Sequence, residues 1–441
     1  MEKILSLTIQ TTESNPIVEG FAQTRQLTYQ QTILCSVVIG IAGGLVATAY
    51  YYVLEACLHF VWHTLPDFIT PKFPIGFSPQ NYIWIVTTIG GLLVGLTLRF
   101  MGLPGEVSMV VDKVHDPGLI EIRQTPAMIV ASLFSITAGG SAGPEAPLVQ
   151  IIGSFGGWLG KKLKVTLVSA RVLTFCGMSA ALGAFFGAPV GGALFALEIP
   201  HRRGLEYYEA LIPAILSAIL SFFVFRLNTG LEIGAIYHFG AVPTLELINL
   251  VEGAILGVLG ALVAILFVVL FRSIGHFSEH IRHHIILLAT LGGLSIGLIA
   301  LVFPQTLFFG EKEIETIVET GSQLGMTMLL MIAFAKMLAI CCTLHSGFRG
   351  GFIFPLFYVG AAVGFAVSLG VPQIHPTIAM ICMMAAVNVA ITKTPISTTV
   401  ILSVLSGTAM IPVIAIASFV SFLLTIQVSL IKTQRSRSFL E

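Results

Sequence analysis

Residues 139–150 read GGSAGPEAPLVQ and place one carboxylate, Glu145, among glycines and prolines with apolar sequence on both sides. A charge inside a bilayer costs about 2.5 kcal/mol or more, so an ionisable residue at that depth usually marks a transport pathway or a proton relay. Pro147 opens a run without further charge to about Gly160, and a proline in the first turn is typical of a helix start. This stretch therefore predicts a helix whose N-terminus holds Glu145.

The N-terminus of a helix attracts anions, because it carries unpaired backbone N–H groups and about half a positive charge. Glu145 and a mobile anion could therefore compete for one place. Transporters use the same arrangement when the N-terminal ends of broken helices point at an anionic substrate near the bilayer midplane. The alternative is that Glu145 serves only as a capping carboxylate.

The composition predicts an all-α polytopic membrane protein, because 56% of the 441 residues are hydrophobic, 10% are charged and the mean hydropathy is +0.94. Some apolar stretches are shorter than the ~20 residues that a spanning helix needs. Short pieces predict broken and re-entrant helices, which are tolerated where they are buried in protein or line a wet cavity. The stretches lie at about 32–61, 82–101, 127–138, 146–160, 172–198, 210–225, 246–271, 285–303, 326–344, 351–371, 377–391 and 396–431.

The charge balance is even, with 22 basic and 22 acidic residues, and it gives no indication of nucleic-acid binding. The lipid bilayer is the expected partner. The six cysteines fall in apolar segments without the spacing of metal ligands, so we expect them to pack in the interior. The sequence predicts no disulfide framework, no metal site and no cofactor.

Clusters of basic residues predict the topology, because such residues favour the cytoplasmic side. Residues 1–30 lack the compact apolar core of a signal peptide and read as a cytosolic tail, and residues 436–441 as a short C-terminal tail. We expect both termini in the cytoplasm, no soluble C-terminal regulatory domain, and a multi-pass protein of a bacterial inner membrane. The clusters are Lys161, Lys162, Lys164 and Arg171; His201, Arg202 and Arg203; Arg272, Arg282 and their histidines; and Lys432, Arg435 and Arg437.

An internal repeat relates two halves, which we place at 31–228 and 229–435. Gly143 and Pro147 recur about 208 positions later as Gly351 and Pro355, and residues 178–189 similarly correspond to 384–395. Paired interrupted segments are typical of a transporter whose site lies at the interface of the repeats. The offsets alone leave the relative orientation of the two halves open.

The counterpart of Glu145 in the second half is Ile353, so one half offers a titratable group and the other only backbone donors. Arg349 precedes that counterpart. Two interpretations of Arg349 stay open: it neutralises the local site, or its long side chain extends to the membrane interface.

Three motifs in the same order resemble those of the CLC family of chloride channels and proton–chloride antiporters. The resemblance runs from about residue 35 to 435. The family's glycine-x-glutamate-x-proline, alanine-proline-glycine and glycine-x-x-x-proline elements match Gly143-Pro144-Glu145-Ala146-Pro147, the segment Ala188-Pro189-Val190-Gly191 that continues to Glu198, and Gly351-Phe352-Ile353-Phe354-Pro355.

This resemblance implies two inverted halves and a homodimer in which each subunit has its own anion pathway. It implies that Glu145 is the gating glutamate, whose carboxylate occupies an anion site until it is protonated, and that the backbone of Phe352 and Ile353 coordinates the anion. The other positions that it assigns to the anion site are Met101, Gly102, Gly143, Pro144, Ala146, Gly351 and Ile431.

Three departures from the family pattern bear on function. Met101 stands where the family's first selectivity loop has a serine, and Ile431 stands where the family has a pore-lining tyrosine. Neither side chain can donate a hydrogen bond to an anion, so we expect weak anion binding through backbone N–H groups and helix dipoles. Ile199, which follows Glu198, replaces the intracellular proton-transfer glutamate of the antiporters.

We therefore predict anion transport, with chloride as the default ion, gated by Glu145 and conducted passively or with loose coupling, since Ile199 cannot titrate. The first alternative is proton–chloride antiport through Glu198, Glu206 or a water wire. A helix turns about 100° per residue, so Glu198 is expected to face away from the direction of Ile199. The second alternative is a fluoride exporter, because fluoride-specific members also lack the serine and the tyrosine, although Pro147 argues against it.

A remote alternative from another class is an intramembrane serine hydrolase, with Ser141 as nucleophile and a histidine such as His345 as base. Rhomboid-like enzymes have glycine-x-serine-glycine, whereas Ala142 follows Ser141 here. We therefore expect that the protein is not an enzyme.

Overall fold

The computed structural model describes residues 25–69, 79–105, 107–205, 207–231, 239 and 244–435. Within these ranges nine helices are long and apolar enough to cross a membrane. The described residues form no β-strand, and their only sheet-like contacts are isolated β-bridges. The predicted all-α polytopic class is therefore confirmed.

The first half of the chain alternates long helices with short ones. The 13 residues of α6 and the 10 of α9 span roughly 20 Å or less at 1.5 Å per residue, which is shorter than the hydrocarbon core. The predicted interrupted helices are therefore present. In order, the helices are α2 (Tyr29–His59), α3 (Leu65–Ile69), α4 (Pro79–Met101), α5 (Val107–His115), α6 (Thr125–Thr137), α7 (Glu145–Lys162), α8 (Leu167–Phe186), α9 (Pro189–Glu198) and α10 (Leu211–Thr229).

The second half repeats this pattern. Its helix α13 is broken at Gly325, whose φ of 77° and ψ of 162° are not helical. The helices are α11 (Leu247–Glu279), α12 (Ile285–Val302), α13 (Glu311–His345), α14 (Ile353–Gly370), α15 (Pro376–Thr392), α16 (Pro395–Ser406) and α17 (Ile411–Thr425).

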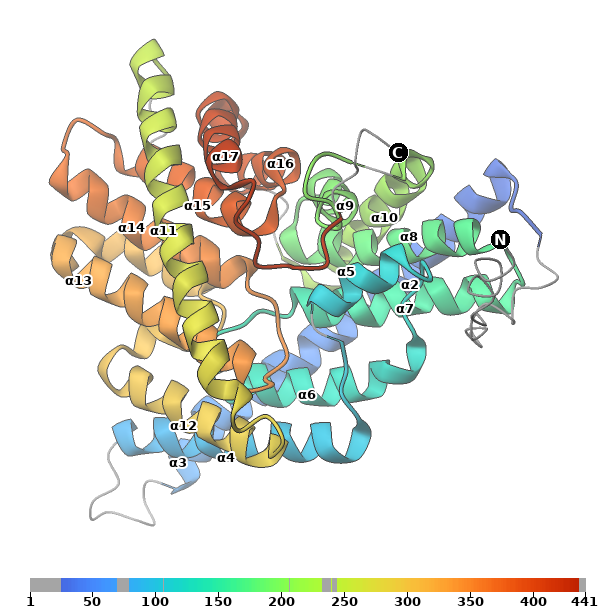
Figure 1. Cartoon of the computed structure of the whole chain (residues 1–441), viewed down its shortest axis with the longest axis horizontal. Coiled ribbons are helices and arrows are strands. Elements are labelled where there is room, and N and C mark those ends of the chain that lie inside the picture. The colour runs from blue at the N-terminus through green and yellow to red at the C-terminus, as the bar shows by residue number, and fades with distance from the viewer. Residues whose placement is uncertain are drawn as a thin grey trace, which may run out of the picture.

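The two halves meet where α7 and α14 begin, and α7 to α10 gather opposite α13 to α17 (Figure 1). Both α7 and α14 have 18 residues, and both start after a glycine of the repeated motif. Gly143 and Gly351 exchange both of their backbone hydrogen bonds, at 2.8 and 2.7 Å, in an antiparallel bridge. Because these glycines are equivalent in the repeat, the reciprocal pair implies a local two-fold axis between them, as expected for inverted repeats.

Glycines allow the first and the last long helix of each half to approach closely. A Cβ atom on Gly44 of α2 would lie 2.7 Å from the carbonyl oxygen of Ser221 on α10. In the second half, a Cβ on Gly257 of α11 would lie 2.9 Å from the carbonyl oxygen of Ala417 on α17. These glycines therefore serve helix packing, as the sequence predicted.

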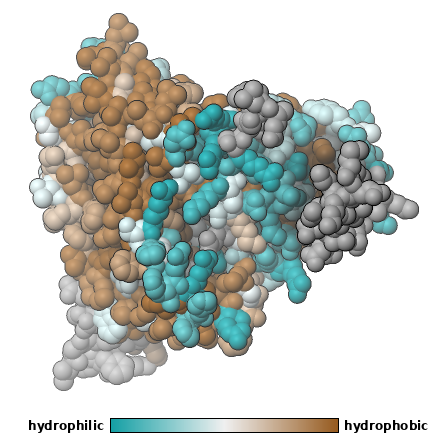
Figure 2. All heavy atoms as spheres, in the orientation of Figure 1, coloured by the Kyte–Doolittle hydropathy of each residue, from teal (hydrophilic) through white to brown (hydrophobic). Residues whose placement is uncertain are grey.

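The surface separates by polarity. Exposed leucine, isoleucine and valine side chains cover α11, as expected for a helix that faces lipid. Figure 2 shows hydrophilic side chains gathered over the middle of one face, beside the hydrophobic side chains of α11. Of the six free cysteines, Cys176, Cys341 and Cys382 are buried and the other three are half-buried.

The predicted boundaries between the tails and the repeats remain predictions. The structure begins α2 at Tyr29 and ends α10 at Thr229, close to the proposed limits at 31 and 228. Residues 1–24 and 436–441 of the proposed tails, and Glu206 of the alternative proton path, lie outside the described residues.

Candidate functional site

Glu145 is buried at the contact between the two halves, with 1% of its surface exposed. It is the first residue of α7. Its carboxylate reaches the opposite half, where Oε1 accepts a hydrogen bond of 3.0 Å from the backbone N–H of Ile353, the first residue of α14. The predicted convergence of these two helix starts, 208 residues apart, is confirmed. The carboxylate lies where the N-terminus of α14 would attract an anion.

Two glycines make room for this carboxylate. A Cβ on Gly143 would lie 2.0 Å from Glu145 Oε2, and a Cβ on Gly351 would lie 2.2 Å from Glu145 Cδ. Backbone atoms can therefore surround the carboxylate only if both positions lack a side chain. The repeated glycines of the two motifs thus have a steric reason.

We expect Gly351→Ala to displace the Glu145 carboxylate and to flatten the pH dependence of any ion flux at least threefold. The added methyl group would overlap the carboxylate. The hydrogen bond from the Ile353 N–H to Glu145 Oε1 could then not form. The control is Gly370→Ala at the other end of α14, where the nearest atom to the new methyl group is the flexible Met326 Sδ at 3.3 Å. A Gly351→Ala protein with the wild-type pH profile would contradict this steric account.

Only part of the hydrogen-bonding capacity of Glu145 is used. Its Oε2 atom is buried without a hydrogen-bond partner among the described residues. A buried acceptor left without a partner costs about 1–3 kcal/mol. The bound position of the charged carboxylate is therefore only partly stabilised, which favours a side chain that can leave it.

A small cavity of about 40 Å³ joins Glu145 to Ile199. It could hold a water molecule by volume, but Glu145 provides the one polar side chain among its described lining residues. The other lining residues are Val110, Val111, Ala146, Val149, Met178, Leu182, Phe195, Gly351, Phe352 and Ile353.

A large cavity of about 780 Å³ reaches the same place from one side of the molecule, and Ala146 and Phe352 line both this cavity and the small one. A third cavity, of about 200 Å³, is lined by Pro144 together with Glu55 and Glu311. The residue before Glu145 thus contacts one cavity and the residue after it contacts another. Glu145 therefore lies between two cavities.

The remaining predicted anion-site residues fall at different distances from this centre. Ile431 is 3% exposed and lines the large cavity. Met101 ends α4, is 47% exposed, and is not among the lining residues of that cavity, which include Leu103 instead. Gly102 between them is exposed, with a φ of 98°. The structure therefore places Ile431, but not Met101, on the wall of the cavity that leads to Glu145.

Arg349 is 6% exposed and lies in the wall of the large cavity with Arg99 and Arg282. This buried residue therefore belongs to the cavity wall and not to a lipid-facing surface. Of the two interpretations of Arg349, this placement favours the one in which it adds positive charge near the site.

Glu198 has a partner that the sequence did not reveal. It is 1% exposed, and its carboxylate accepts hydrogen bonds from the backbone N–H of Ile396 at 3.1 Å and from the N–H and Oγ of Ser397 at 2.8 and 2.6 Å. Glu198 therefore caps α16. Its neighbour Ile199 lines the small cavity with Glu145, so the two adjacent residues serve different places, as their helical spacing predicted. The proline at the start of α16 was the one available sign of this contact.

Two buried lysines were also missed. Lys336 Nζ donates hydrogen bonds to three successive carbonyl oxygens, of Thr306, Leu307 and Phe308, at 3.1, 3.1 and 2.8 Å. Lys393 Nζ donates to the carbonyl oxygen of Thr425 at 2.7 Å. Each lysine is bonded to backbone and is fully buried, so both hold loops or helix ends in place.

The geometry around Ser141 gives no support to a hydrolase. Ser141 is fully buried, its backbone N–H donates to Thr343 Oγ1 at 3.0 Å, and its own Oγ has no hydrogen-bond partner among the described residues. The His345 ring packs against Phe271, with 4.0 Å between ring centroids. A nucleophile must lie within hydrogen-bonding reach of its base, and no such pair is formed by Ser141. Within the described ranges there is also no group of three or more potential metal ligands.

A carboxylate held between the helix starts of two inverted halves, with cavities on either side, defines a multi-pass membrane protein of the inverted-repeat transport class. The sequence profile of the voltage-gated chloride channel family matches residues 89–425. The chain therefore belongs to this family, the CLC family.

Similar proteins cover most of the chain. A chloride/fluoride channel protein of Pseudomonas syringae pv. tomato is 28% identical over 366 residues, which are 80% of this chain and 78% of that protein. The Escherichia coli protein YfeO, whose name describes an ion-transport protein, is 25% identical over 402 residues, 89% of this chain and 92% of its own.

Two solved structures share the fold. A CLC-type fluoride/proton antiporter superposes with a TM-score of 0.77 at 21% identity, covering 93% of this chain and 100% of its own. A slow cyanobacterial Cl⁻/H⁺ antiporter superposes with a TM-score of 0.76 at 21% identity, covering 89% of this chain and 94% of its own.

Proposed function

We propose that this protein conducts small anions, with chloride as the default ion, through a path that Glu145 closes. The observation that carries the proposal is the 3.0 Å hydrogen bond from the Ile353 N–H to Glu145 Oε1. A helix N-terminus binds mobile anions and carboxylates by the same N–H groups and the same dipole. The charged side chain therefore occupies the place that a permeating anion needs.

Protonation would open this path. A neutral carboxyl group loses most of its attraction to the helix N-terminus, because that attraction depends on the negative charge. The side chain could then leave its position between Gly143 and Gly351, and an anion could take its place. Flux should therefore increase as the pH falls. The cavities on both sides of the motif support this order of events.

Membership of the CLC family supports anion transport, and the path from Glu145 to Ile199 favours passive or loosely coupled conduction. Antiport needs a group that receives the proton beyond Glu145, and the side chain at the far wall of the small cavity is Ile199, which has no ionisable group. Glu198 is engaged as the cap of α16. Neither residue is placed to accept a proton from Glu145 through that cavity.

Replacing Glu198 by glutamine separates passive conduction from antiport through Glu198. We expect Glu198→Gln to lower the thermal unfolding midpoint, because one of the oxygens that now cap α16 becomes an amide that cannot accept a bond. Anion flux per folded protein should stay within about twofold, since Glu198 does not line the described cavities around Glu145. Proton movement that is driven by a chloride gradient in the wild type and lost in Glu198→Gln would establish antiport through Glu198.

Proton-coupled antiport is the second candidate function. It is favoured by the small cavity at Glu145, which could hold a water molecule. The structurally similar proteins named above are described as antiporters, although their low sequence identity supports the fold alone. A water wire could then replace a titratable side chain.

Fluoride export is the third candidate. It is favoured by Ile431, which offers no hydroxyl group to the large cavity, and by the name of the Pseudomonas syringae relative. A comparison of chloride and fluoride efflux from the same vesicles decides between the ions. Equal or faster chloride efflux supports the main proposal, and efflux of fluoride alone contradicts it.

We further propose that two copies form a homodimer in a bacterial inner membrane. Large apolar side chains are exposed on α9, α10, α16 and α17, a set of helices that a second copy could cover. The exposed residues are Val190, Ile212, Ile219, Phe223, Leu227, Ile396, Ile411, Phe419, Leu423 and Leu424. Cross-linking between copies within these helices tests this arrangement, and a mass of one chain in lipid nanodiscs would contradict it.

A further inference from the structure

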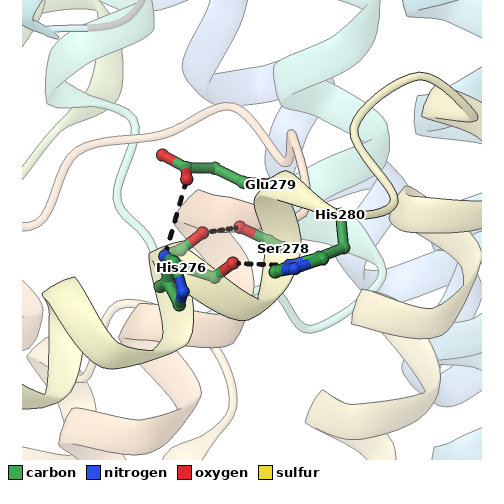
Figure 3. A network of polar contacts seen from close by, with 5 residues as sticks. His276, Ser278, Glu279 and His280 are labelled. Carbon is green, nitrogen blue, oxygen red and sulfur yellow. Dashed lines mark hydrogen bonds and ion pairs between the residues drawn. The ribbon is translucent and has the colours of Figure 1, made fainter.

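A group of four histidines and two arginines lies where α11 ends and α12 begins. His276 in the last turn of α11 and His280 directly after this helix stand one turn apart, with 5.5 Å between their ring centroids. Figure 3 shows both rings at the end of this helix, with the Glu279 carboxylate turned toward His276. The whole group, which we call the histidine rim, consists of Arg272, His276, His280, Arg282, His283 and His284, all exposed.

The histidine rim borders the large cavity that leads to Glu145. Four residues interleaved with the histidines, Gly275, Ser278, Glu279 and Arg282, line this cavity. Arg272 is fixed nearby, because its Nη2 donates a 3.1 Å hydrogen bond to the carbonyl oxygen of Ser429. The rim therefore stands at the mouth of the route by which an anion would approach the site.

Four of the six side chains of the rim are imidazoles. Imidazole side chains generally change charge between pH 5 and pH 8. With neutral imidazoles, the two arginines and the neighbouring Glu279 sum to a net charge of +1. Protonation of all four histidines would raise this net charge to +5. Glu279 itself contacts His276, with 3.7 Å between Oε2 and Nδ1, and its side chain is 66% exposed.

The groups that face the rim from neighbouring segments have the same sign. Glu279 is the one acidic residue among the described residues that line the large cavity. The others that carry or can acquire positive charge there are Arg99 from α4, His345 from the end of α13, Arg349 before α14 and, on the segment after α17 that Arg272 contacts, Lys432. Protonation of the rim therefore adds to a positive potential and does not neutralise a negative one.

We propose that the histidine rim is a surface that concentrates permeating anions at the entrance of the large cavity, more strongly as the pH falls. This inference rests on the proposed anion conduction. Charges of one sign around a concave entrance raise the local concentration of the opposite ion and its rate of entry. The effect is carried by exposed side chains, so salt should screen it, with a Debye length of about 10 Å at 0.1 M. It is independent of the gate at Glu145.

The test uses chloride efflux from phosphatidylcholine vesicles that hold the full-length Glu145→Gln protein, whose gate cannot titrate. With equal pH on both sides and about 20 mM salt, lowering the pH from about 7.5 to about 5.5 should raise the flux about threefold. The rise should vanish when His276, His280, His283 and His284 are all replaced by glutamine, and also at about 300 mM salt.

The matched control replaces His59 and His63 by glutamine. This second exposed histidine pair stands at the end of α2, with 5.2 Å between ring centroids. In contrast to the rim, whose neighbouring residues line the large cavity, α2 contributes no described residue to that lining. These substitutions should leave the threefold rise unchanged. Because the rim residues are exposed, the fourfold variant should fold, which size-exclusion chromatography checks.

Three outcomes would count against the inference in distinguishable ways. A flux in Glu145→Gln vesicles that is present but independent of pH at low salt would overturn the role of the rim. A rise that appears only when anionic phosphatidylglycerol is included would show that the rim binds lipid phosphate and not mobile anions. No chloride flux from the wild type or from Glu145→Gln would refute the proposed function itself.

Discussion

Replacing Glu145 by glutamine should increase anion flux about tenfold or more at neutral pH and remove the dependence of flux on pH at about 300 mM salt. Glutamine is neutral at every pH, so it imitates the protonated side chain. The wild-type carboxylate is held by the Ile353 N–H as long as it is charged. Wild-type flux should therefore rise as the pH falls, by up to about tenfold per pH unit where the carboxyl group titrates.

The matched control for this experiment is Glu198→Gln. Glu198 is also a carboxylate with 1% exposure that binds the N-terminus of a helix in the other half. It differs from Glu145 in lying outside the described cavities. Its replacement should leave the pH profile of the wild type in place. If Glu145→Gln kept the wild-type pH profile at high salt, Glu145 would be a structural cap and not a gate.

Replacing Lys336 by methionine should lower the stability of the protein by roughly 3 kcal/mol. Three carbonyl oxygens, those of Thr306, Leu307 and Phe308, would lose their bond to Nζ, at about 1.5 kcal/mol each for bonds from a charged donor. Part of this loss is offset, because methionine, unlike lysine, does not bury a charged group. The control is Lys312→Met on the same helix, where the lysine is exposed.

The consequence of losing Lys336 should extend toward the site. The N–H of Phe308 donates to the carbonyl oxygen of Gly139 at 3.4 Å, and Leu307 packs where a Cβ on Gly139 would lie. The segment that Lys336 holds therefore supports the start of the GGSAGPEAP loop. Thermal unfolding in detergent measures the effect, with an expected fall of roughly 5 °C. A midpoint within 1 °C of the wild type would show that the three bonds contribute little.

Local signals explain why the fold class and the centre of the site could be predicted from the sequence. Glycine, glutamate and proline near Glu145, and the matching glycine and proline near Ile353, each mark a helix start without reference to the rest of the chain. Their constant offset indicated that the two starts are equivalent in a repeat. The hydrogen bond between Glu145 and Ile353 follows from that equivalence.

Partners far apart in the sequence explain what could not be predicted. Glu198 bonds to backbone N–H groups almost 200 residues away, and Lys336 bonds to carbonyl oxygens about 30 residues away. Backbone groups are present at every position, so no residue pattern announces these contacts. Met101 matched a selectivity motif, yet as the last residue of α4 it is 47% exposed and outside the lining of the large cavity.

The most direct test of a Glu145-gated anion path records chloride efflux and external pH together in one suspension of proteoliposomes. Vesicles with the protein should release chloride faster than protein-free vesicles. This release should quicken as the pH is lowered, and no protons should move against their gradient in a fixed ratio to chloride. Vesicles that retain their chloride would contradict anion conduction, and stoichiometric uphill proton movement would contradict its passive form.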